Sequence, residues 1–323
     1  MKAVYLEEEV VNKGDISMEP ITSLMETRFF HNTTEADKYE HIGDAEVVYT
    51  NKIIFDEETF ARCPKLRYLG VCATGYNVID LDAAGRHGVT VTNVPAYSTE
   101  SVTQLTWGFI LECASRMSLH NDSVHRGDWI ASESFCYWLA PVTELAGKTL
   151  GIVGYGNIGR RVAEVAKAFR MKALIFTAHP EKYEKMKSHS VTGAAEFVSF
   201  EELLRQSDVI TLHCPMTRDT EGMICRENIS RMKDGVILIN VSRGGLVNEA
   251  DLAEALSSGK VAAAAVDVVS SEPMKADNPL LGAPNLMITP HMAWASVEAR
   301  TRLVQTVADN CRSWLEGKGQ NVL

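Results

Sequence analysis

Short runs of apolar, largely β-branched residues alternate with amphipathic stretches along almost the whole chain. This alternation is typical of βα units, in which helices connect parallel strands. Strands are predicted at 3–6, 47–50, 66–71, 89–92, 149–153, 173–176, 209–212, 236–240, 263–268 and 287–289. Several of them, such as 236–240, are apolar at consecutive positions, as expected where helices cover both faces of a sheet. The pattern therefore predicts an α/β fold with parallel sheets.

Two chain crossings between domains are predicted from the longer elements. Amphipathic stretches predict helices over 101–117, 200–206 and 296–316. The turn-rich segment 92–100 precedes the first of these helices, and Ile-Thr-Pro-His at 288–291 precedes the last. We place the crossings at these two points. The predicted organisation is a discontinuous outer domain, 1–99 and 291–323, around an inserted domain, 100–290.

Composition narrows the class of partner. The 323 residues include 42 acidic and 32 basic side chains, which gives a net charge of −10. An acidic surface repels phosphate backbones and anionic lipid, so neither nucleic acid nor a membrane is the expected partner. The seven cysteines are scattered and lack CxxC spacing, which argues against a disulfide framework and against a metal site. No apolar run approaches the ~18 residues that a membrane span needs, and the chain is expected to be cytoplasmic.

A glycine-rich motif directly follows a predicted strand. It reads Gly-Tyr-Gly-Asn-Ile-Gly and opens a helix with an apolar face. In this context Gly154 permits a tight turn, Gly156 lets the backbone approach a pyrophosphate, and Gly159 permits close packing of helix and strand. The free N–H groups at the helix N-terminus favour an anion. The inserted domain is therefore predicted to bind a dinucleotide. The predicted cofactor-binding residues of the motif are Gly154, Tyr155, Gly156, Asn157, Ile158 and Gly159.

The residue that selects between NAD and NADP is predicted at Thr177. Motifs of this kind usually carry an Asp or Glu ~20 residues on, at the end of the next strand, where it binds the ribose hydroxyls. Here that strand is followed by Thr177, Ala178 and His179, so the fixed negative charge that would reject a 2′-phosphate is absent. Arg160 and Lys182 are further cations nearby. The predicted cofactor is NAD or NADP, and the choice between them stays open.

Three later segments carry polar residues at or just after predicted strand ends. They contain Arg243, then Asp267 and Glu272, and then His291. Open α/β sheets bind their ligands at the carboxyl ends of the strands. A single arginine, glutamate or histidine is more often a solvated or structural residue. Their joint occurrence downstream of a dinucleotide motif predicts a catalytic site.

Over residues 66–300 the chain resembles the D-isomer-specific 2-hydroxyacid dehydrogenase family. The likeness is carried by the motif at 154–159 and by the segments around Arg243, Glu272 and His291. In that family both domains are Rossmann-like, the outer domain binds the substrate, and the enzyme is usually a homodimer. The resemblance implies that Arg243, Glu272 and His291 are the catalytic residues, and that the partner is a small 2-oxo or 2-hydroxy acid.

The chemistry of a 2-oxo acid reduction agrees with these roles. The reaction needs a hydride donor, a proton donor for the developing alkoxide and a cation for the carboxylate. Histidine ordinarily titrates near pH ~6.5, which makes His291 the expected proton donor. Glu272 would bond the other ring nitrogen and favour the imidazolium, and Arg243 offers a planar, permanently charged fork. Asp267 is implied by the resemblance to lie near the nicotinamide carboxamide.

Substrate-binding residues are implied by the same resemblance. Backbone N–H groups, chiefly at Thr74 and Gly75, would bind the substrate carboxylate. The segments 73–80 and 93–101 are most similar to the glycerate dehydrogenase (hydroxypyruvate reductase) branch of the family. That branch reduces hydroxypyruvate to D-glycerate and often accepts glyoxylate. Trp138 is the candidate specificity residue, because a tryptophan in this loop of relatives can reach the pocket of the neighbouring subunit.

Two other functions stay open. The residues that would line the side pocket cannot be separated from one sequence, so a D-lactate-type dehydrogenase or a reductase of bulkier 2-oxo acids is an alternative. The family also includes nucleotide-sensing corepressors, which bind other proteins and keep the catalytic residues. His213 and Trp294 lie near the active site by resemblance, and no chemical step is assigned to either.

Overall fold

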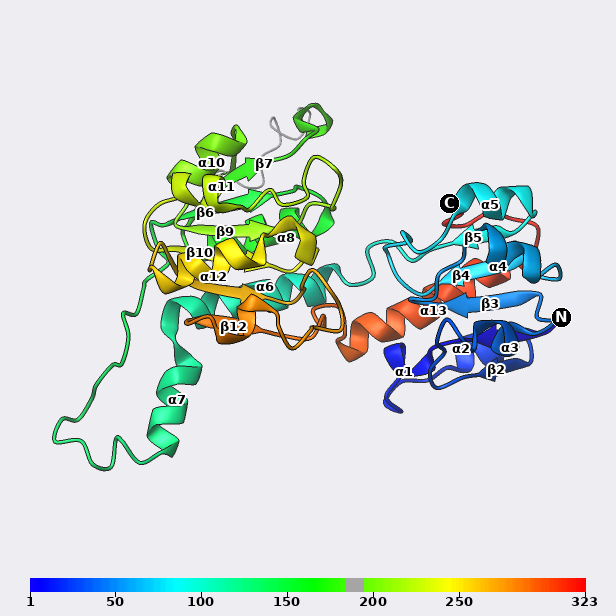
Figure 1. Cartoon of the computed structure of the whole chain (residues 1–323), viewed down its shortest axis with the longest axis horizontal. Coiled ribbons are helices and arrows are strands. Elements are labelled where there is room, and N and C mark those ends of the chain that lie inside the picture. The colour runs from blue at the N-terminus through cyan, green and yellow to red at the C-terminus, as the bar shows by residue number, and fades with distance from the viewer. Residues whose placement is uncertain (184–194) are drawn as a thin grey trace. The chain divides into compact units, whose positions relative to one another are not determined.

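The chain forms two compact units in the computed structural model, which describes residues 1–183 and 195–323. One unit comprises Met1–Ser98 and Trp294–Leu323, and the other comprises Thr99–Ala293. Each unit is built on its own sheet (Figure 1). The second unit extends past the crossing predicted at 288–291, so His291 belongs to it. The reason is that Asp267, which follows the strand Val261–Val266, accepts hydrogen bonds from the backbone N–H groups of residues 291–293.

The first unit contains a five-stranded parallel sheet in the order β2-β1-β3-β4-β5. Its strands are β1 (Ala3–Tyr5), β2 (Thr27–Phe29), β3 (Val47–Thr50), β4 (Tyr68–Val71) and β5 (Thr90–Thr92). Its helices are α1 (Glu8–Val11), α2 (Glu19–Thr22), α3 (Lys38–Ile42), α4 (Glu57–Arg62), α5 (Leu81–Arg86) and α13 (Val297–Leu315). Successive strand residues point to opposite faces, so Val48 packs in one buried cluster while Tyr49 packs against α13 in the other.

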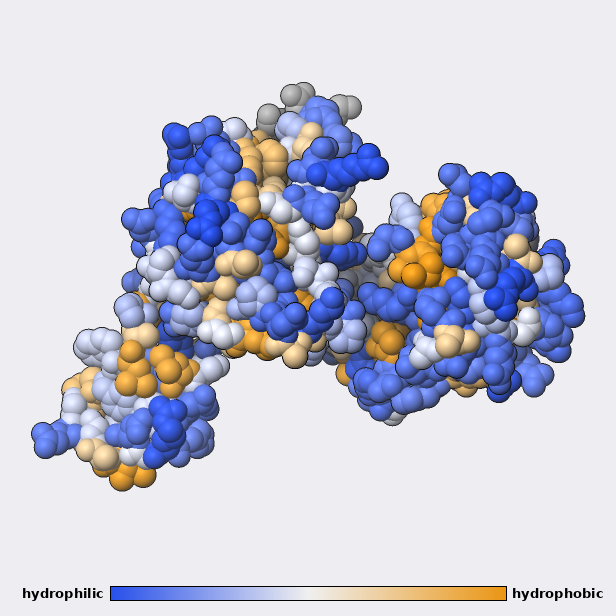
Figure 2. All heavy atoms as spheres, viewed as in Figure 1, coloured by the Kyte–Doolittle hydropathy of each residue, from blue (hydrophilic) through white to orange (hydrophobic). Residues whose placement is uncertain are grey.

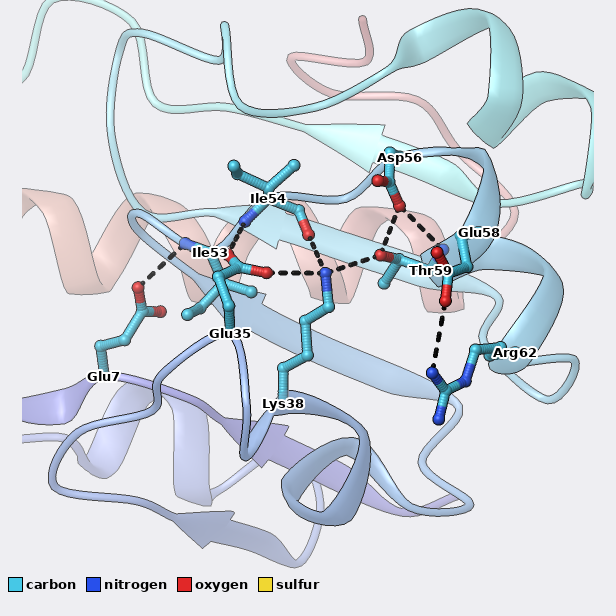
Figure 3. A network of polar contacts seen from close by, with 9 residues as sticks. All are labelled: Glu7, Glu35, Lys38, Ile53, Ile54, Asp56, Glu58, Thr59 and Arg62. Carbon is cyan, nitrogen blue, oxygen red and sulfur yellow. Dashed lines mark hydrogen bonds and ion pairs between the residues drawn. The ribbon is translucent and has the colours of Figure 1, made fainter.

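A buried lysine ties three segments of the first unit together. The ammonium of Lys38, in α3, donates to the carbonyl of Ile54 at 3.1 Å and to the hydroxyl of Thr59 at 2.9 Å. It also lies 2.7 Å from a carboxylate oxygen of Glu35 (Figure 3). A buried ammonium is tolerated only when it is paired and hydrogen-bonded, and these three oxygens meet that need. They connect α3, the segment after β3, and α4.

The second unit contains a seven-stranded parallel sheet in the order β12-β11-β10-β9-β6-β7-β8. Its strands are β6 (Thr149–Val153), β7 (Lys172–Phe176), β8 (Ala195–Phe197), β9 (Val209–Leu212), β10 (Val236–Asn240), β11 (Val261–Val266) and β12 (Leu286–Ile288). Its α-helices are α6 (Thr99–Ser115), α7 (Met117–His125), α8 (Asn157–Ala168), α10 (Phe200–Gln206), α11 (Arg226–Arg231) and α12 (Glu249–Ser257). Short 3-10 turns are η1 (Pro180–Tyr183), η2 (Gly244–Leu246) and η3 (Pro279–Gly282).

The predicted α/β class is confirmed, and the differences concern two edge strands, the bounds of one inner strand and one helix. Strands β2 and β8 were not predicted; each is short, lies at an edge and exposes part of its side chains, so neither has a run of buried apolar residues. The strand predicted over 263–268 was placed wrongly: β11 covers Val261–Val266, since Asp267 already belongs to the turn beyond it. Helix α7 was also missed, because most of its surface is exposed and its sequence is largely polar.

Membrane-spanning helices and metal-ligand clusters are both absent from residues 1–183 and 195–323. No helix there is long and apolar enough to cross a membrane. No group of three or more His, Cys, Asp or Glu side chains there could hold a metal ion. All seven cysteines are free thiols.

Candidate active site

The glycine motif forms a turn in which two of the three glycines leave no room for a side chain. Gly154 has a φ of +97°, and a Cβ there would lie 2.6 Å from the backbone nitrogen of Cys214. A Cβ on Gly159 would overlap the carbonyl oxygen of Gly154, so the start of α8 packs directly on the turn. Gly156 has open space on its Cβ side. This combination fits a dinucleotide, because the pyrophosphate needs close approach to the backbone at the middle glycine.

The turn lies where the connections of the sheet reverse direction. The chain runs from β6 to β7 and β8 on one side, and then returns to β9 on the other side of β6. Ligands of open α/β sheets bind at such a switch point, at the carboxyl ends of the strands. Helix α8 begins at Asn157 with no side-chain cap, so its first N–H groups are available to an anion. The ring of Tyr155 instead packs against Tyr183 and Phe197, which leaves only its backbone to contribute to the turn.

Thr177 follows β7 at the predicted cofactor-selecting position. Its hydroxyl accepts a long hydrogen bond of 3.4 Å from the backbone N–H of His179. The His179 ring lies 3.2 Å from Glu181, and the Arg160 guanidinium folds back to bond Asn157 and the carbonyl of Gly156. Arg160 and His179 are therefore engaged with other groups of the chain. Thr177 itself carries no acidic side chain of the kind that selects NAD.

Arg243, Glu272 and His291 come from three neighbouring strands. Arg243 follows β10, Glu272 follows β11 and His291 follows β12, and these strands are consecutive in the sheet. Because all three strands are parallel, their carboxyl ends meet at one edge of the sheet. The glycine turn after β6 lies at the same edge, two strands beyond β10.

The histidine and the glutamate form a close pair. Nδ1 of His291 lies 2.6 Å from Oε2 of Glu272, while Oε1 of Glu272 accepts a hydrogen bond of 3.2 Å from the backbone N–H of Val269. The two side chains are 29% and 36% exposed, so both remain accessible to a small molecule. Since the carboxylate bonds Nδ1, it orients the ring, and Nε2 is the nitrogen left to exchange a proton with a substrate.

The turn that carries His291 is organised by Asp267. This aspartate is buried, and its carboxylate accepts hydrogen bonds from the hydroxyl of Thr289, the N–H of Met292 at 2.9 Å and the N–H of Ala293 at 2.8 Å. Burial raises the pKa of Asp267 above its ordinary value, and these hydrogen bonds oppose the shift. Both of its oxygens are thus used within the protein, and the position near a nicotinamide expected for Asp267 stays a prediction.

Arg243 is presented by a loop whose backbone is tightly held. The Asn240 side-chain amide donates to the carbonyl of Arg243 at 2.9 Å, and its carbonyl oxygen accepts from the N–H of Ser242 at 3.1 Å. A Cβ on Gly244 would overlap the carbonyl of Val269, so the arginine loop packs directly against the segment that leads to Glu272. The guanidinium itself is exposed and bonds only the carbonyl of Ser242 in the hydrogen bonds observed, at 2.8 Å.

Two residues that support the site were missed in the sequence. Asn240 shapes the arginine loop, and Glu249 accepts hydrogen bonds from the N–H and hydroxyl of Ser270 and from the amide of Asn278. Glu249 thereby holds the segment that contains Glu272. The position of Asn240 at the end of a strand was a usable signal, whereas nothing in the sequence connects Glu249 with residues 270–278.

The remaining predicted residues are distributed over both units. Thr74 and Gly75 follow β4 in the first unit. Trp294 also belongs to that unit, where its ring packs edge-on against Tyr97. Trp138 lies in the second unit, in the segment after α7, and is 72% exposed. Both ring nitrogens of His213 are buried with no hydrogen-bond partner among the described residues, and burial lowers its pKa to about 3, so the ring is neutral.

The sheet, the glycine turn and the paired histidine define a dinucleotide-dependent oxidoreductase, and comparison with known proteins identifies its family. Residues 107–293 match the model of the D-isomer specific 2-hydroxyacid dehydrogenase NAD-binding domain. The chain is 45% identical over 326 residues to a hydroxypyruvate reductase of Blautia hydrogenotrophica, covering 100% of this chain and 99% of that one. It is 38% identical over 325 residues to a glycerate dehydrogenase of Methylorubrum extorquens, covering 100% and 98%. The chain belongs to the D-isomer specific 2-hydroxyacid dehydrogenases.

Solved structures agree on the fold and on the class of cofactor. An acyclic imino acid reductase in complex with NADPH and D-Arg has a TM-score of 0.83 and 26% identity, and the likeness covers 100% of both chains. The family model is that of an NAD-binding domain, while this structural relative holds NADPH. The prediction of NAD or NADP as the cofactor is confirmed, as is the prediction of an oxidoreductase of this family.

Proposed function

We propose that this enzyme reduces hydroxypyruvate to D-glycerate, and glyoxylate to glycolate, with NADH or NADPH. The observation that carries the proposal is the 2.6 Å pair of His291 and Glu272, placed beside the Arg243 loop at the edge of the sheet where the glycine turn lies. The similarity over the full chain to a hydroxypyruvate reductase and to a glycerate dehydrogenase supports this choice of substrate.

The catalytic roles follow from the chemistry of the three side chains. When bound, the nicotinamide supplies the hydride. His291 donates a proton from Nε2 to the oxygen of the substrate carbonyl as negative charge develops there. Glu272 holds the ring through Nδ1 and stabilises its protonated form by opposite charge. Arg243 binds the substrate carboxylate and polarises the carbonyl through its fixed fork of N–H donors.

The loop after β4 supplies the second contact to the substrate carboxylate. Residues 73–75 follow the central part of the first unit's sheet at its carboxyl edge, where parallel sheets present their ligand sites. The proposed donors are the backbone N–H groups of Thr74 and Gly75. Backbone donors suit a small carboxylate, since they add no side-chain bulk to the site and lose little conformational freedom on binding.

We also propose a homodimer that forms through the segment over residues 117–142. Large apolar side chains gather there on α7 and the loop that follows it (Figure 2). Ile130 is 91% exposed, Phe135 is 87% exposed and Trp138 is 72% exposed. Apolar patches of this kind mark association surfaces. In a symmetric dimer this segment would pack on the partner, and by family resemblance Trp138 would approach the partner's substrate site.

The cytoplasm is the proposed location. Seven free thiols, of which Cys136 is exposed, suit a reducing compartment. Oxidation of an exposed thiol is more frequent outside such a compartment. Fractionation of the native organism, with the activity recovered in the cytoplasmic fraction, tests this assignment.

The substrate assignment is tested by initial rates of cofactor oxidation. Hydroxypyruvate, glyoxylate and pyruvate are compared at saturating NADH and at saturating NADPH, each with a blank that lacks the acid. The expected result is the highest kcat/KM on hydroxypyruvate, lower values on glyoxylate, and the lowest on pyruvate. A highest value on pyruvate or on a bulkier 2-oxo acid contradicts the assignment of substrate.

A further inference from the structure

We infer that Asn51 and Asn93 are positioning residues that hold the loop after β4 in the conformation that binds a carboxylate. This inference rests on the proposed function, in which residues 73–75 bind the substrate carboxylate. Neither asparagine needs to touch the substrate for this role. The two side chains come from opposite sides of the loop, since Asn51 follows β3 and Asn93 follows β5, the two strands that flank β4.

Three consecutive carbonyl groups of the loop are taken up by donors from these flanking segments. The Asn51 amide donates to the carbonyl of Cys72 at 2.7 Å. The backbone N–H of Val94 donates to the carbonyl of Ala73 at 3.0 Å. The Asn93 amide donates to the carbonyl of Thr74 at 2.8 Å. The direction of each peptide group in the loop is therefore determined by a hydrogen bond to its oxygen.

The N–H groups of the same stretch behave in the opposite way. Within residues 1–183 and 195–323, none of the backbone N–H groups of Ala73, Thr74 and Gly75 donates a hydrogen bond. The Thr74 hydroxyl donates back to the carbonyl of Val94 at 2.8 Å, so it does not compete for those donors. Successive free N–H groups form a concave site for an anion. The backbone carbonyls of residues 72–74 are thus bound within the protein, whereas the N–H groups of residues 73–75 remain available to a ligand.

Each asparagine is itself held by buried groups. On one side, the buried carboxylate of Glu7 accepts from the N–H groups of Asn51 at 3.0 Å, Lys52 at 2.8 Å and Ile53 at 3.2 Å. Figure 3 shows Glu7 and its contact with Ile53. These bonds fix the backbone that presents the Asn51 amide. Glu7 follows β1, which lies next to β3 in the sheet, so the hydrogen bonds that support the loop extend from β4 across β3 to β1.

On the other side, the support comes from the C-terminal part of the chain. The amide of Asn310, in α13, donates to the carbonyl of Asn93 at 2.9 Å, and the amide of Asn321 donates to the side-chain oxygen of Asn310 at 2.9 Å. The backbone N–H of Asn93 donates to the carbonyl of Asn321 at 3.3 Å. Asn51, Asn93 and Asn310 are all nearly buried, so water does not replace their amides easily.

The function of this arrangement is preorganisation. A loop with unbound carbonyls would sample peptide orientations that turn the N–H groups away from the carboxylate. Binding would then cost conformational entropy, and the affinity for the carboxylate would be lower. The asparagine amides order the loop before the substrate arrives. Loss of one amide is expected to weaken binding of any carboxylate at this site without changing the chemistry at His291.

The test compares Asn51→Ala and Asn93→Ala with Asn228→Ala in the full-length enzyme. Asn228 is a matched control, since its amide donates to the carbonyl of Met223 at 2.9 Å in the second unit. Asn51→Ala and Asn93→Ala are each expected to raise KM for hydroxypyruvate about tenfold, which is the effect of one lost hydrogen bond. The inhibition constant of oxalate, a carboxylate that cannot be reduced, should rise by a similar factor. The kcat should change less than about threefold, and the Kd of NADH should not change.

The outcomes separate this inference from the proposed function. Suppose that the wild type reduces hydroxypyruvate, and that Asn51→Ala and Asn93→Ala bind NADH and keep the wild-type KM and oxalate affinity. The positioning role is then wrong, and the proposed function stands. If the wild type reduces no 2-oxo acid, the proposed function itself fails. The isosteric Asn93→Asp should raise KM further than Asn93→Ala, because its carboxylate would face the carbonyl of Thr74 and repel a bound anion. Two sites on opposite sides keep the test decisive if one variant does not fold.

Discussion

His291, the proposed proton donor, has an unusual backbone conformation. Its φ is +52°, a region that non-glycine residues rarely occupy, and its N–H donates to the carbonyl of Asp267 at 2.7 Å. Strained residues persist where surrounding hydrogen bonds determine them, and here the Asp267 carboxylate binds the next two N–H groups as well. In this conformation the imidazole Nδ1 lies 2.6 Å from the Glu272 carboxylate, which holds the ring in one orientation.

Replacement of His291 by alanine tests its proposed role at this scale. The variant should lose about 10²–10⁴-fold in kcat, the usual contribution of a general acid, and should bind NADH as the wild type does. His31→Ala is a matched control, because His31 is an exposed histidine of the first unit that pairs with Glu9. Initial rates and fluorescence titration with NADH give the two quantities. A kcat close to that of the wild type would remove His291 from the mechanism.

Replacement of Thr177 by aspartate tests the cofactor-selecting position. An added carboxylate at the end of β7 should repel a 2′-phosphate and accept hydrogen bonds from ribose hydroxyls, so the ratio of kcat/KM for NADPH to that for NADH should fall at least about tenfold. Thr301→Asp places the same charge on an exposed helix position of the first unit and should leave the ratio unchanged. An unchanged ratio in Thr177→Asp would show that another residue selects the cofactor.

The sequence predicted the grouping of the proposed catalytic residues, but it did not predict the residues that hold them in place. Arg243, Glu272 and His291 were predicted together, and the structure places them on adjacent strand ends. Their reactive side chains occur in recognisable motifs, whereas Glu249, Asn51 and Asn93 act through bonds to residues far away in the sequence. Such partners depend on the tertiary fold, and no local pattern announces them.

Among the elements, α13 connects the C-terminal end of the chain to the first unit. Arg300, in its first turns, is nearly buried and bonds both carboxylate oxygens of Asp15 at 2.7 Å. The same guanidinium donates to the carbonyls of Val11 and Ala295. These bonds fix α13 against the segment after α1. The hydrogen bonds from Arg300 lower the pKa of Asp15 from 3.8 to about 2.

Replacement of Asp15 by asparagine should lower the Tm of the enzyme at pH 7. A carboxyl whose pKa is lower in the folded state stabilises the fold above its unfolded pKa, and this stabilisation is lost as the pH falls through the folded value. The difference in Tm between wild type and Asp15→Asn should therefore shrink as the pH falls from 3.8 toward 2. Asp44→Asn is the control, since Asp44 pairs with Lys2 at an exposed site and its loss should change Tm little. A difference that does not vary with pH would contradict the assignment.

The elements themselves were mostly predictable. Central strands such as β9 and β10 are fully buried and apolar at consecutive positions, so their sequences mark them clearly. The helix predicted over 200–206 was found at the predicted bounds, where Ser199 caps the N–H of Glu202 at 3.2 Å. Edge strands β2 and β8 escaped prediction because partial exposure admits polar residues.

On the scale of the whole molecule, the two units divide the proposed work. The second unit carries the glycine turn and the three proposed catalytic residues, and the first carries the loop proposed to bind the substrate carboxylate. The segment over 117–142 adds a third feature, a group of large exposed apolar side chains. The sequence predicted association only through family resemblance, since exposure of apolar side chains depends on the fold.

Paired substitution of Ile130 and Phe135 by aspartate tests the proposed dimer. Two charges in the centre of the apolar segment should dissociate the dimer, because buried unpaired carboxylates are costly at an interface. Light scattering should then give a mass near 35.6 kDa for the variant and about twice that for the wild type. Leu281→Asp changes an apolar residue that is 58% exposed outside this segment and should leave the mass unchanged. A single-subunit mass for the active wild type would contradict the proposal.

The most direct test of the central claim is chiral analysis of the product that the purified enzyme forms from hydroxypyruvate. The wild type is incubated with hydroxypyruvate and either NADH or NADPH, and the glycerate is resolved by enantiomer, with His291→Ala run in parallel. D-glycerate is expected from the wild type, and almost no product from the variant. L-glycerate, or equal turnover by both proteins, would contradict it.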